Sequence, residues 1–241
     1  MTSFPRLPPF APGMRIGLLG GSFNPPHEGH ALITRLALRR LALDRVWWLV
    51  TPGNPLKSLT GLAALKARVE AARRLHVGPC VVVTDIEAQI GSRFTYDTLL
   101  WLRRRAPRVH FVWIMGADNL RQFHLWRHWR LIADLVPIVV VDRPGSTLKA
   151  ISSPAGAALA GARVPERDAT RFAAIQPPAL LFLHGPRSRL SSTALRGEGG
   201  REDGGALSAV SDQDAGRRHL FAEPDNIRTR GSGYGENCNS R

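Results

Sequence analysis

The chain has 241 residues, 44% of them hydrophobic and 22% charged, which is the composition of an ordinary globular protein with one domain and a tail. Its net charge of +14 at pH 7 fits nucleic acid, anionic lipid or polyphosphate ligands, but an Arg-rich coding composition would produce the same excess. No stretch is apolar over the length of a membrane span, and the proline-rich start is unlike a secretory signal, so we expect neither membrane insertion nor secretion.

Six short apolar runs, rich in Val, Ile and Leu and without alternation, predict strands that are buried on both faces. They cover residues 15–19, 46–50, 81–84, 109–115, 137–141 and 180–183. Helical patterns lie between them at 30–41, 62–75, 95–105 and, with an interruption, 119–134. This alternation predicts an α/β fold: a doubly wound, Rossmann-like parallel sheet with helices on both faces.

The two ends of the chain differ in composition from the middle. Residues 1–13 hold four prolines, and we expect a flexible N-terminal extension there, followed by one domain over 14–196. Residues 197–241 are mostly Gly, Ser and charge with little to bury, which predicts a disordered tail. Cys80 and Cys238 show neither a disulfide framework nor metal-ligand spacing, so a cytoplasmic location fits best.

The junction after the first predicted strand, in the stretch IGLLGGSFNPPHEGH, has the residue types of a phosphate-binding loop. Gly20 and Gly21 have no Cβ atom, so an anion can approach the backbone closely. Pro25 and Pro26 keep the loop extended and delay the next helix until about His27. In a doubly wound sheet, ligands bind at the carboxyl ends of the strands, where this loop lies.

Two histidines stand at the start of that helix. His27 and His30 are three residues apart, so they share one face of its first turn. The helix N-terminus adds unpaired N–H groups and a partial positive charge, and together these features predict a phosphate cradle with two imidazole donors. Ordinary surface histidines are a weaker interpretation, and a zinc site lacks a third ligand, as does the second pair, His124 and His128.

The GGSFNPPHEGH motif resembles the H-x-G-H nucleotidyltransferases, and within them the bacterial nicotinate mononucleotide adenylyltransferases. Six further segments are similar to that family in the same order: TPGNPLK, RFTYDTL, MGADNL, LWRHW, VVVDRPG and LSSTALR. With the first motif they extend over residues 15–196, which the resemblance makes a nucleotidyltransferase domain. The family continues past the last segment into a closing helix, whereas this chain enters its Gly-rich tail.

The resemblance implies a reaction between ATP and nicotinate mononucleotide that gives nicotinate adenine dinucleotide and pyrophosphate. The attacking 5′-phosphate is largely ionised at pH 7, because the second pKa of a phosphate monoester is about 6. Such a site needs positioning and positive charge rather than a general base. Mg²⁺ is expected as the cofactor, bound through the ATP phosphates without a direct protein ligand.

The same resemblance assigns residues to the two substrates. We expect catalytic roles for His27, His30, Lys57 and Arg196. ATP would contact Gly20, Gly21, Ser22, Phe23, His27, His30, Gly116, Asp118, Ser192, Thr193 and Arg196. The pyridine nucleotide would contact Lys57, Thr95, Tyr96, Trp126 and Arg143, with Thr95 and Tyr96 offering amides at a helix N-terminus to the carboxylate.

Several alternatives stay open from the sequence. Ser192 and Asp118 are also ordinary helix-capping residue types, and Trp129 is as good a candidate as Trp126 for stacking on the pyridine ring. A related enzyme could use nicotinamide mononucleotide or phosphopantetheine instead. An Arg-rich nucleic-acid-binding module is a non-enzymatic alternative, but the Arg residues are scattered, so no nucleic-acid partner is expected. The oligomeric state is not predicted.

Overall fold

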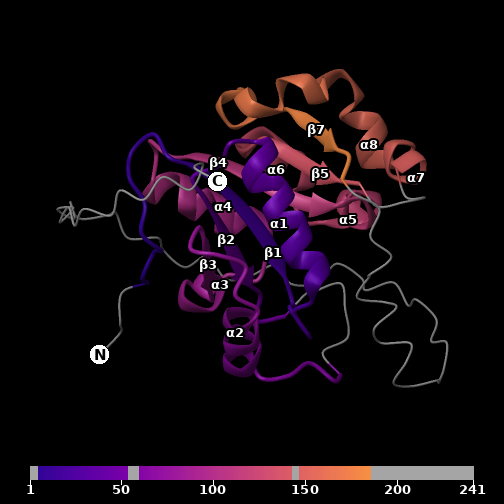
Figure 1. The fold of residues 1–241 in the computed structure, drawn as a ribbon. Helices are drawn as coiled ribbons and strands as arrows, with labels where there is room; N and C mark the ends of the chain where they lie inside the picture. Colours follow the sequence, from indigo (N-terminus) through magenta and orange to yellow (C-terminus); the bar gives the residue numbers. More distant parts are fainter. Residues whose placement is uncertain (1–4, 54–59, 143–146, 186–241) are drawn as a thin grey trace, which may run out of the picture.

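A seven-stranded parallel sheet forms the centre of the computed structural model, which describes residues 5–53, 60–142 and 147–185 (Figure 1). In spatial order the strands are β3 (Val81–Thr84), β2 (Arg45–Val50), β1 (Arg15–Gly21), β4 (His110–Gly116), β5 (Ile138–Val141), β7 (Leu180–Leu183) and β6 (Arg163–Val164). The chain order reverses between β1 and β4, so the predicted doubly wound α/β fold is confirmed, with its switch point at the end of β1.

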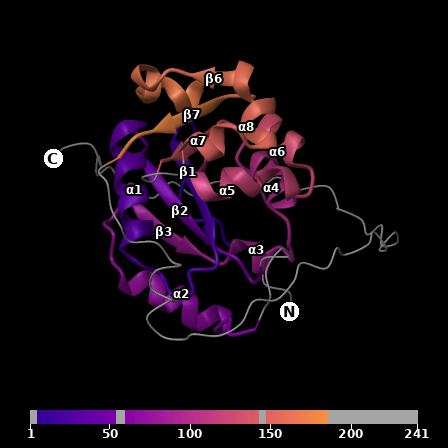
Figure 2. The ribbon, with the colours of Figure 1, turned by 90° about the vertical axis from the view of Figure 1, so that its right-hand side faces the viewer.

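The sheet is covered on both faces, as its continuous apolar strands require. Neighbouring residues of β2 point to opposite sides: Trp47 belongs to the core on one face and Trp48 to the core on the other, and both are fully buried. In Figure 2 the helices lie on the two sides of the sheet. Such double burial is what the Val- and Ile-rich strand composition predicts.

One face of the sheet is covered by three helical elements, which are α1 (Glu28–Arg40), α2 (Leu65–Arg74) and the 3-10 helix η3 (Glu166–Ala174). The other face is covered by a larger number of helices, most of them short. They are α3 (Ile86–Gln89), α4 (Thr95–Arg105), α5 (Ala117–Gln122), the 3-10 helix η1 (Phe123–Leu125), α6 (Trp129–Leu135), α7 (Thr147–Ile151) and α8 (Pro154–Ala158). The 3-10 helix η2 (Ala160–Ala162) follows α8 and has no buried residue. Among the described residues, no helix has the length and apolar character needed to cross a bilayer.

The predicted elements correspond closely to the observed ones. The interrupted helical pattern at 119–134 is the α5–η1–α6 sequence, and the pattern at 62–75 is α2, which begins three residues later than expected. The elements that were not expected, α3, α7, α8, η2, β6 and η3, are short or irregular, so they carry little periodicity.

Residues 5–13, expected to form a flexible extension, lie against the core. The ring of Phe10 meets that of Trp47 edge-on at 6.4 Å, and Leu7 packs against the same cluster. Two backbone hydrogen bonds also fix this segment. The N–H of Gly13 donates to the carbonyl of Arg108 at 2.7 Å, and the N–H of Arg6 donates to Gln89 Oε1 at 2.8 Å. The apolar side chains between the prolines account for this packing.

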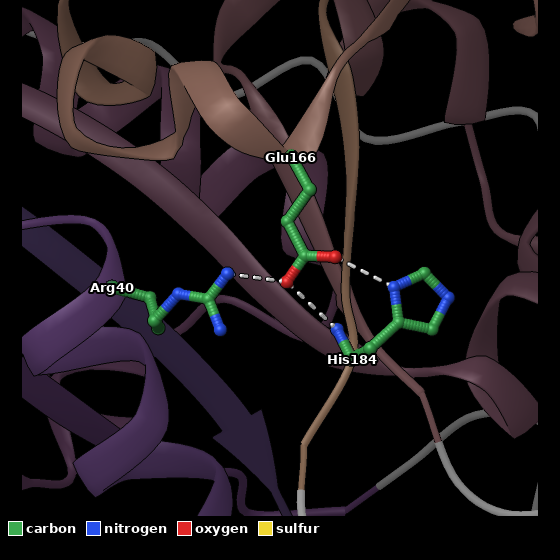
Figure 3. A network of polar contacts seen from close by, with 3 residues as sticks. All are labelled: Arg40, Glu166 and His184. Atoms are coloured by element: carbon green, nitrogen blue, oxygen red, sulfur yellow. Dashed lines mark hydrogen bonds and ion pairs between the residues drawn. The ribbon is translucent and has the colours of Figure 1, made fainter.

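The last strand is tied to α1 by one carboxylate (Figure 3). Glu166 Oε1 accepts hydrogen bonds from Arg40 Nη2 at 2.7 Å and from the backbone N–H of His184 at 3.2 Å. Glu166 Oε2 accepts from His184 Nδ1 at 2.7 Å. Burial acts to raise the pKa of Glu166, but the His184 hydrogen bonds and the charge of Arg40 outweigh it, so the pKa is lowered.

Candidate active site

The loop between β1 and α1 places two histidines at the first turn of the helix. His27 is the N-cap, in extended conformation, and its Nδ1 accepts a hydrogen bond from the backbone N–H of Gly29 at 3.1 Å. His30 Nδ1 accepts from the backbone N–H of His27 at 3.3 Å. Each ring therefore satisfies a backbone donor that the helix leaves without an intrahelical acceptor. The helix begins where Pro25 and Pro26 predict it.

These caps determine the tautomer of both rings. A ring nitrogen that accepts a hydrogen bond carries no proton, so a neutral His27 or His30 has its N–H at Nε2. The two ring centroids are 4.0 Å apart, and the side chain of His27 is 6% exposed. The structure thus brings together two imidazole donors at a helix N-terminus, on the carboxyl edge of the sheet.

Phe23 supports this pair from the side of the sheet. Its ring stacks on Trp48 with centroids 4.9 Å apart and lies 4.7 Å from the ring of His30. Its backbone is left-handed, with φ at +48°, which is strained for a residue with a side chain. Trp48 Nε1 donates to Thr34 Oγ1, and Thr34 Oγ1 donates to the carbonyl of His30, each at 2.8 Å, so the first turn of α1 is anchored to β2.

Gly20 has a packing role as well as the expected one of admitting an anion. A Cβ atom at Gly20 would lie 2.6 Å from Cη2 of Trp113 on β4, and one at Gly21 would lie 3.3 Å from the Phe23 ring. Trp113 is 2% exposed and cannot easily move. The first glycine is therefore required by the neighbouring strand, whatever binds above it.

The second strand at the switch point is β4. Its residue Ile114 pairs with Leu19 of β1, so the chain leaves both strands at the same edge of the sheet. Gly116 is the N-cap of α5, and Asp118 is exposed in its first turn. Both therefore lie on the edge where the β1–α1 loop lies.

The residues expected at the pyridine ring come from α4 and from the segment before α6. Thr95 and Tyr96 begin α4, and the ring of Tyr96 meets that of His128 edge-on at 5.1 Å. Trp126 packs edge-on against Trp113 at 6.1 Å, the residue that also contacts Gly20. Trp126 and Gly20 therefore border the same side chain, that of Trp113.

Trp129 packs differently from Trp126. Both rings meet Phe123 edge-on, at 5.4 Å for Trp126 and 5.8 Å for Trp129, but the guanidinium of Arg130 lies 4.4 Å above the ring of Trp129. Among the ring contacts of the described residues, Trp126 but not Trp129 meets a strand residue, Trp113, whose indole also borders Gly20 of β1. The geometry favours Trp126 as the aromatic residue nearer the site. The other predicted site residues, Lys57, Arg143, Ser192, Thr193 and Arg196, lie outside the described ranges.

Two buried ionisable residues near these loops were not expected. Arg68, on α2, is 2% exposed and donates only to backbone carbonyls, including that of Ser22. Glu87, on α3, is buried; burial raises its pKa to about 7, and hydrogen bonds from Thr51 and Thr98 act in the opposite direction. The sequence signal for Arg68 is its position on the same helix face as the apolar residues of α2.

No group of three or more His, Cys, Asp or Glu side chains in the described ranges is arranged to hold a metal ion. What the site does offer is the Nε2–H groups of two imidazoles and a glycine-containing loop, beside the positive end of a helix dipole. Donors of this kind bind phosphate oxygens.

The chain is similar to proteins of one activity. The sequence pattern of the cytidylyltransferase-like family matches residues 18–198. A probable nicotinate-nucleotide adenylyltransferase of Methylorubrum extorquens is 61% identical over 183 residues, which cover 76% of this chain and 99% of that protein. The protein of the same name from Agrobacterium fabrum is 54% identical over 183 residues, covering 76% and 98%.

Solved structures support the fold. Plasmodium falciparum nicotinic acid mononucleotide adenylyltransferase complexed with NaAD has a TM-score of 0.57 at 16% identity, covering 76% of this chain and 82% of that one. The same enzyme complexed with APC has a TM-score of 0.56 at 15% identity, covering 76% and 83%.

Proposed function

The chain belongs to the nicotinate-nucleotide adenylyltransferases, and from this premise we propose how its residues transfer the adenylyl group of ATP to nicotinate mononucleotide. The products are nicotinate adenine dinucleotide and pyrophosphate, so the protein is a nucleotidyltransferase of NAD biosynthesis. The observation that carries the residue assignment is the His27–His30 pair, with both Nδ1 atoms held by backbone N–H groups.

The reaction needs no proton transfer. An oxygen of the 5′-phosphate of nicotinate mononucleotide forms a bond to the α-phosphorus, and the bond from that phosphorus to the bridging oxygen breaks. Pyrophosphate leaves with the electron pair of that bond. Negative charge shifts toward the α-phosphate oxygens and the leaving group, so positioned N–H donors lower the barrier.

We assign the α-phosphate to His30 and the neighbouring phosphates to His27. Their Nε2–H groups are fixed in direction because Nδ1 of each ring is already bonded. The backbone of Gly20–Phe23 would add donors, and the N-terminus of α1 would add a favourable dipole. We retain Lys57, Ser192, Thr193 and Arg196 as further phosphate ligands on the basis of the motif resemblance.

We assign the other substrate to the opposite side of the switch point. Thr95 and Tyr96 would meet the nicotinate carboxylate with the amides at the start of α4, and Trp126 would stack on the ring. Arg143 is retained as an anion ligand of this substrate, and Asp118 as a ligand of the ATP ribose or of a metal-bound water.

Mg²⁺ is the proposed cofactor, bound through ATP. The donor set described above suits phosphate oxygens rather than a cation, so the ion would be held by the phosphates and by water. When bound, it neutralises charge on the phosphates. We further propose a cytoplasmic enzyme, because its substrate ATP is abundant there, with residues 14–196 as the nucleotidyltransferase domain and no nucleic-acid partner.

The decisive experiment supplies purified protein with Mg²⁺, ATP and either nicotinate or nicotinamide mononucleotide. Dinucleotide and pyrophosphate should form in equal amounts, and faster with nicotinate mononucleotide. Absence of both dinucleotides would refute the function. An equal rate with the two mononucleotides would refute only the substrate preference.

A further inference from the structure

Arg68 joins three segments of the chain by a single buried side chain. Its Nε donates to the carbonyl of Ala63 at 2.8 Å, and its Nη1 donates to the carbonyls of Ser22 and Thr51, each at 2.7 Å. Its Nη2 lies 3.3 Å from the carbonyl of Pro52. The residue is 2% exposed, so these contacts replace its hydration.

These carbonyls belong to the loops that leave the carboxyl edge of the sheet. Ser22 follows β1, Thr51 and Pro52 follow β2, and Ala63 precedes α2. Arg68 therefore holds the phosphate-facing loop against both ends of the β2–α2 connection. Asn24 strengthens the same junction, since its Nδ2 donates to the carbonyl of Gly61 at 3.0 Å.

The position of Ser22 bears directly on the histidine pair. The next residue, Phe23, has a left-handed backbone and packs its ring against His30 at 4.7 Å. A strained backbone of this kind persists only where surrounding contacts hold it. The hydrogen bond from Arg68 to the Ser22 carbonyl is such a contact, one residue away from the strained position.

The charge of Arg68 is also unbalanced within the described ranges. No carboxylate there lies within ion-pair distance of its guanidinium, and burial alone lowers the pKa of the side chain. Carbonyl dipoles offset part of the cost of burying a cation, but full compensation requires an anion nearby. A triphosphate bound at residues 20–23 would supply it, because Arg68 donates a hydrogen bond to the carbonyl of Ser22 in that loop.

We propose that Arg68 is a positioning residue for adenylyl transfer: it fixes the β1–α1 loop beside the ATP phosphates, and those phosphates, rather than a carboxylate of the described residues, balance its charge. This inference rests on the proposed function. It differs from a purely structural role, because a structural arginine would stabilise the free and ATP-bound protein equally.

The test compares Arg68→Met and Arg68→Lys with Arg73→Met. Arg73 lies on the same helix, but its side chain is exposed and pairs with Glu70 on the helix surface, so Arg73→Met is the matched control. We measure kcat and KM for ATP at a temperature where circular dichroism shows each variant to be folded. Thermal unfolding scans with and without Mg²⁺ and ATP give the rise in Tm that these ligands produce.

For Arg68→Met we expect kcat to fall about 10²-fold, the size of effect that a 1 Å misplacement of reacting groups produces. The ATP-induced rise in Tm should be largely lost. Arg68→Lys should keep most of that rise because it keeps the charge, but not the wild-type kcat, since one ammonium group cannot replace a planar fork. Arg73→Met should match the wild type in every measurement.

Two outcomes would overturn the inference. One is a folded Arg68→Met variant with wild-type kcat and an unchanged ATP-induced rise in Tm. The other, which applies even if the variants fail to fold, is a wild-type Arg68 Nε–H resonance that does not shift when ATP is added. If the wild type forms no dinucleotide, the proposed function fails instead, and the effect of ATP on Tm still reports on Arg68.

Discussion

The backbone N–H of His27 donates to Nδ1 of His30, so the ring proposed to face the transferred phosphate is also a cap of its own helix. One side chain thus has two tasks on two different nitrogen atoms. Substitutions that imitate one nitrogen at a time can separate them, because the amide oxygen of Asn reaches the position of Nδ1 and the amide of Gln that of Nε2.

For His30→Ala we expect kcat to fall about 10²–10³-fold with a smaller change in ATP affinity, as for the loss of one donor to a developing charge. His30→Asn should recover thermal stability but not kcat, and His30→Gln should recover part of kcat. Steady-state kinetics and Tm measurements on the three variants test this. A wild-type kcat for His30→Asn would show that only the cap matters.

Gly20→Ala should destabilise the protein, because its methyl group would overlap the buried indole of Trp113. Overpacking of this kind costs about 1–3 kcal/mol. Adding Trp113→Phe should reduce the loss in a double-mutant cycle measured by urea unfolding. Gly161→Ala is the control, since a Cβ there meets no atom within 4 Å, and an equal loss in both variants would contradict the explanation.

Glu87 should make stability depend on pH between its two pKa values. The folded pKa of about 7 lies above the ordinary value of 4.5, so the folded state holds the proton more tightly than the unfolded state. The contribution to stability is complete below about pH 4.5 and is lost as the pH rises through about 7. Glu87→Gln removes this dependence.

Urea unfolding at pH 5 and pH 8 measures the effect. The free energy of unfolding of Glu87→Gln, relative to that of the wild type, should be larger at pH 8 than at pH 5 by about 2–3 kcal/mol, at about 1.4 kcal/mol for each pKa unit. Glu70→Gln, at an exposed position, should show no such difference. Parallel pH profiles for wild type and Glu87→Gln would contradict the assignment.

Trp126→Leu should raise KM for nicotinate mononucleotide and leave KM for ATP nearly unchanged. Loss of an aromatic stacking partner costs about 0.5–1.5 kcal/mol, which corresponds to a change of about two- to twelvefold. Trp129→Leu, whose ring packs on Phe123, should lower stability without this selective effect. The reverse result would make Trp129 the stacking residue.

The parts of the fold that can be predicted are those whose burial or backbone geometry produces a pattern within a few neighbouring residues. The strands are buried on both faces, so each appears as a continuous apolar run, and the prolines at 25 and 26 mark where α1 begins. The two-residue strand β6 and the 3-10 helix η3 were not predictable, because neither is long enough or regular enough to show a period.

In the candidate site, too, contacts between neighbouring residues can be predicted and contacts between distant segments cannot. The His27–His30 pair is local, and its spacing alone places both rings on one turn. Arg68 and Trp113 act on residues 46 and 93 positions away in the chain, and those contacts depend on how the loops and strands meet. A helical pattern indicates which face of α2 is buried, but not that an arginine on that face will find carbonyls there.

The sheet order has a consequence for synthesis on the ribosome. Of the strands in the described ranges β7 is the last to be made, yet it lies between β5 and β6, each of which pairs with it. Until residue 183 has emerged, one side of β5 has no partner, and its sequence Ile-Val-Val-Val is the kind of open apolar edge that recruits other chains. A nascent chain released between β5 and β7 would therefore carry an aggregation-prone edge that the finished protein does not expose.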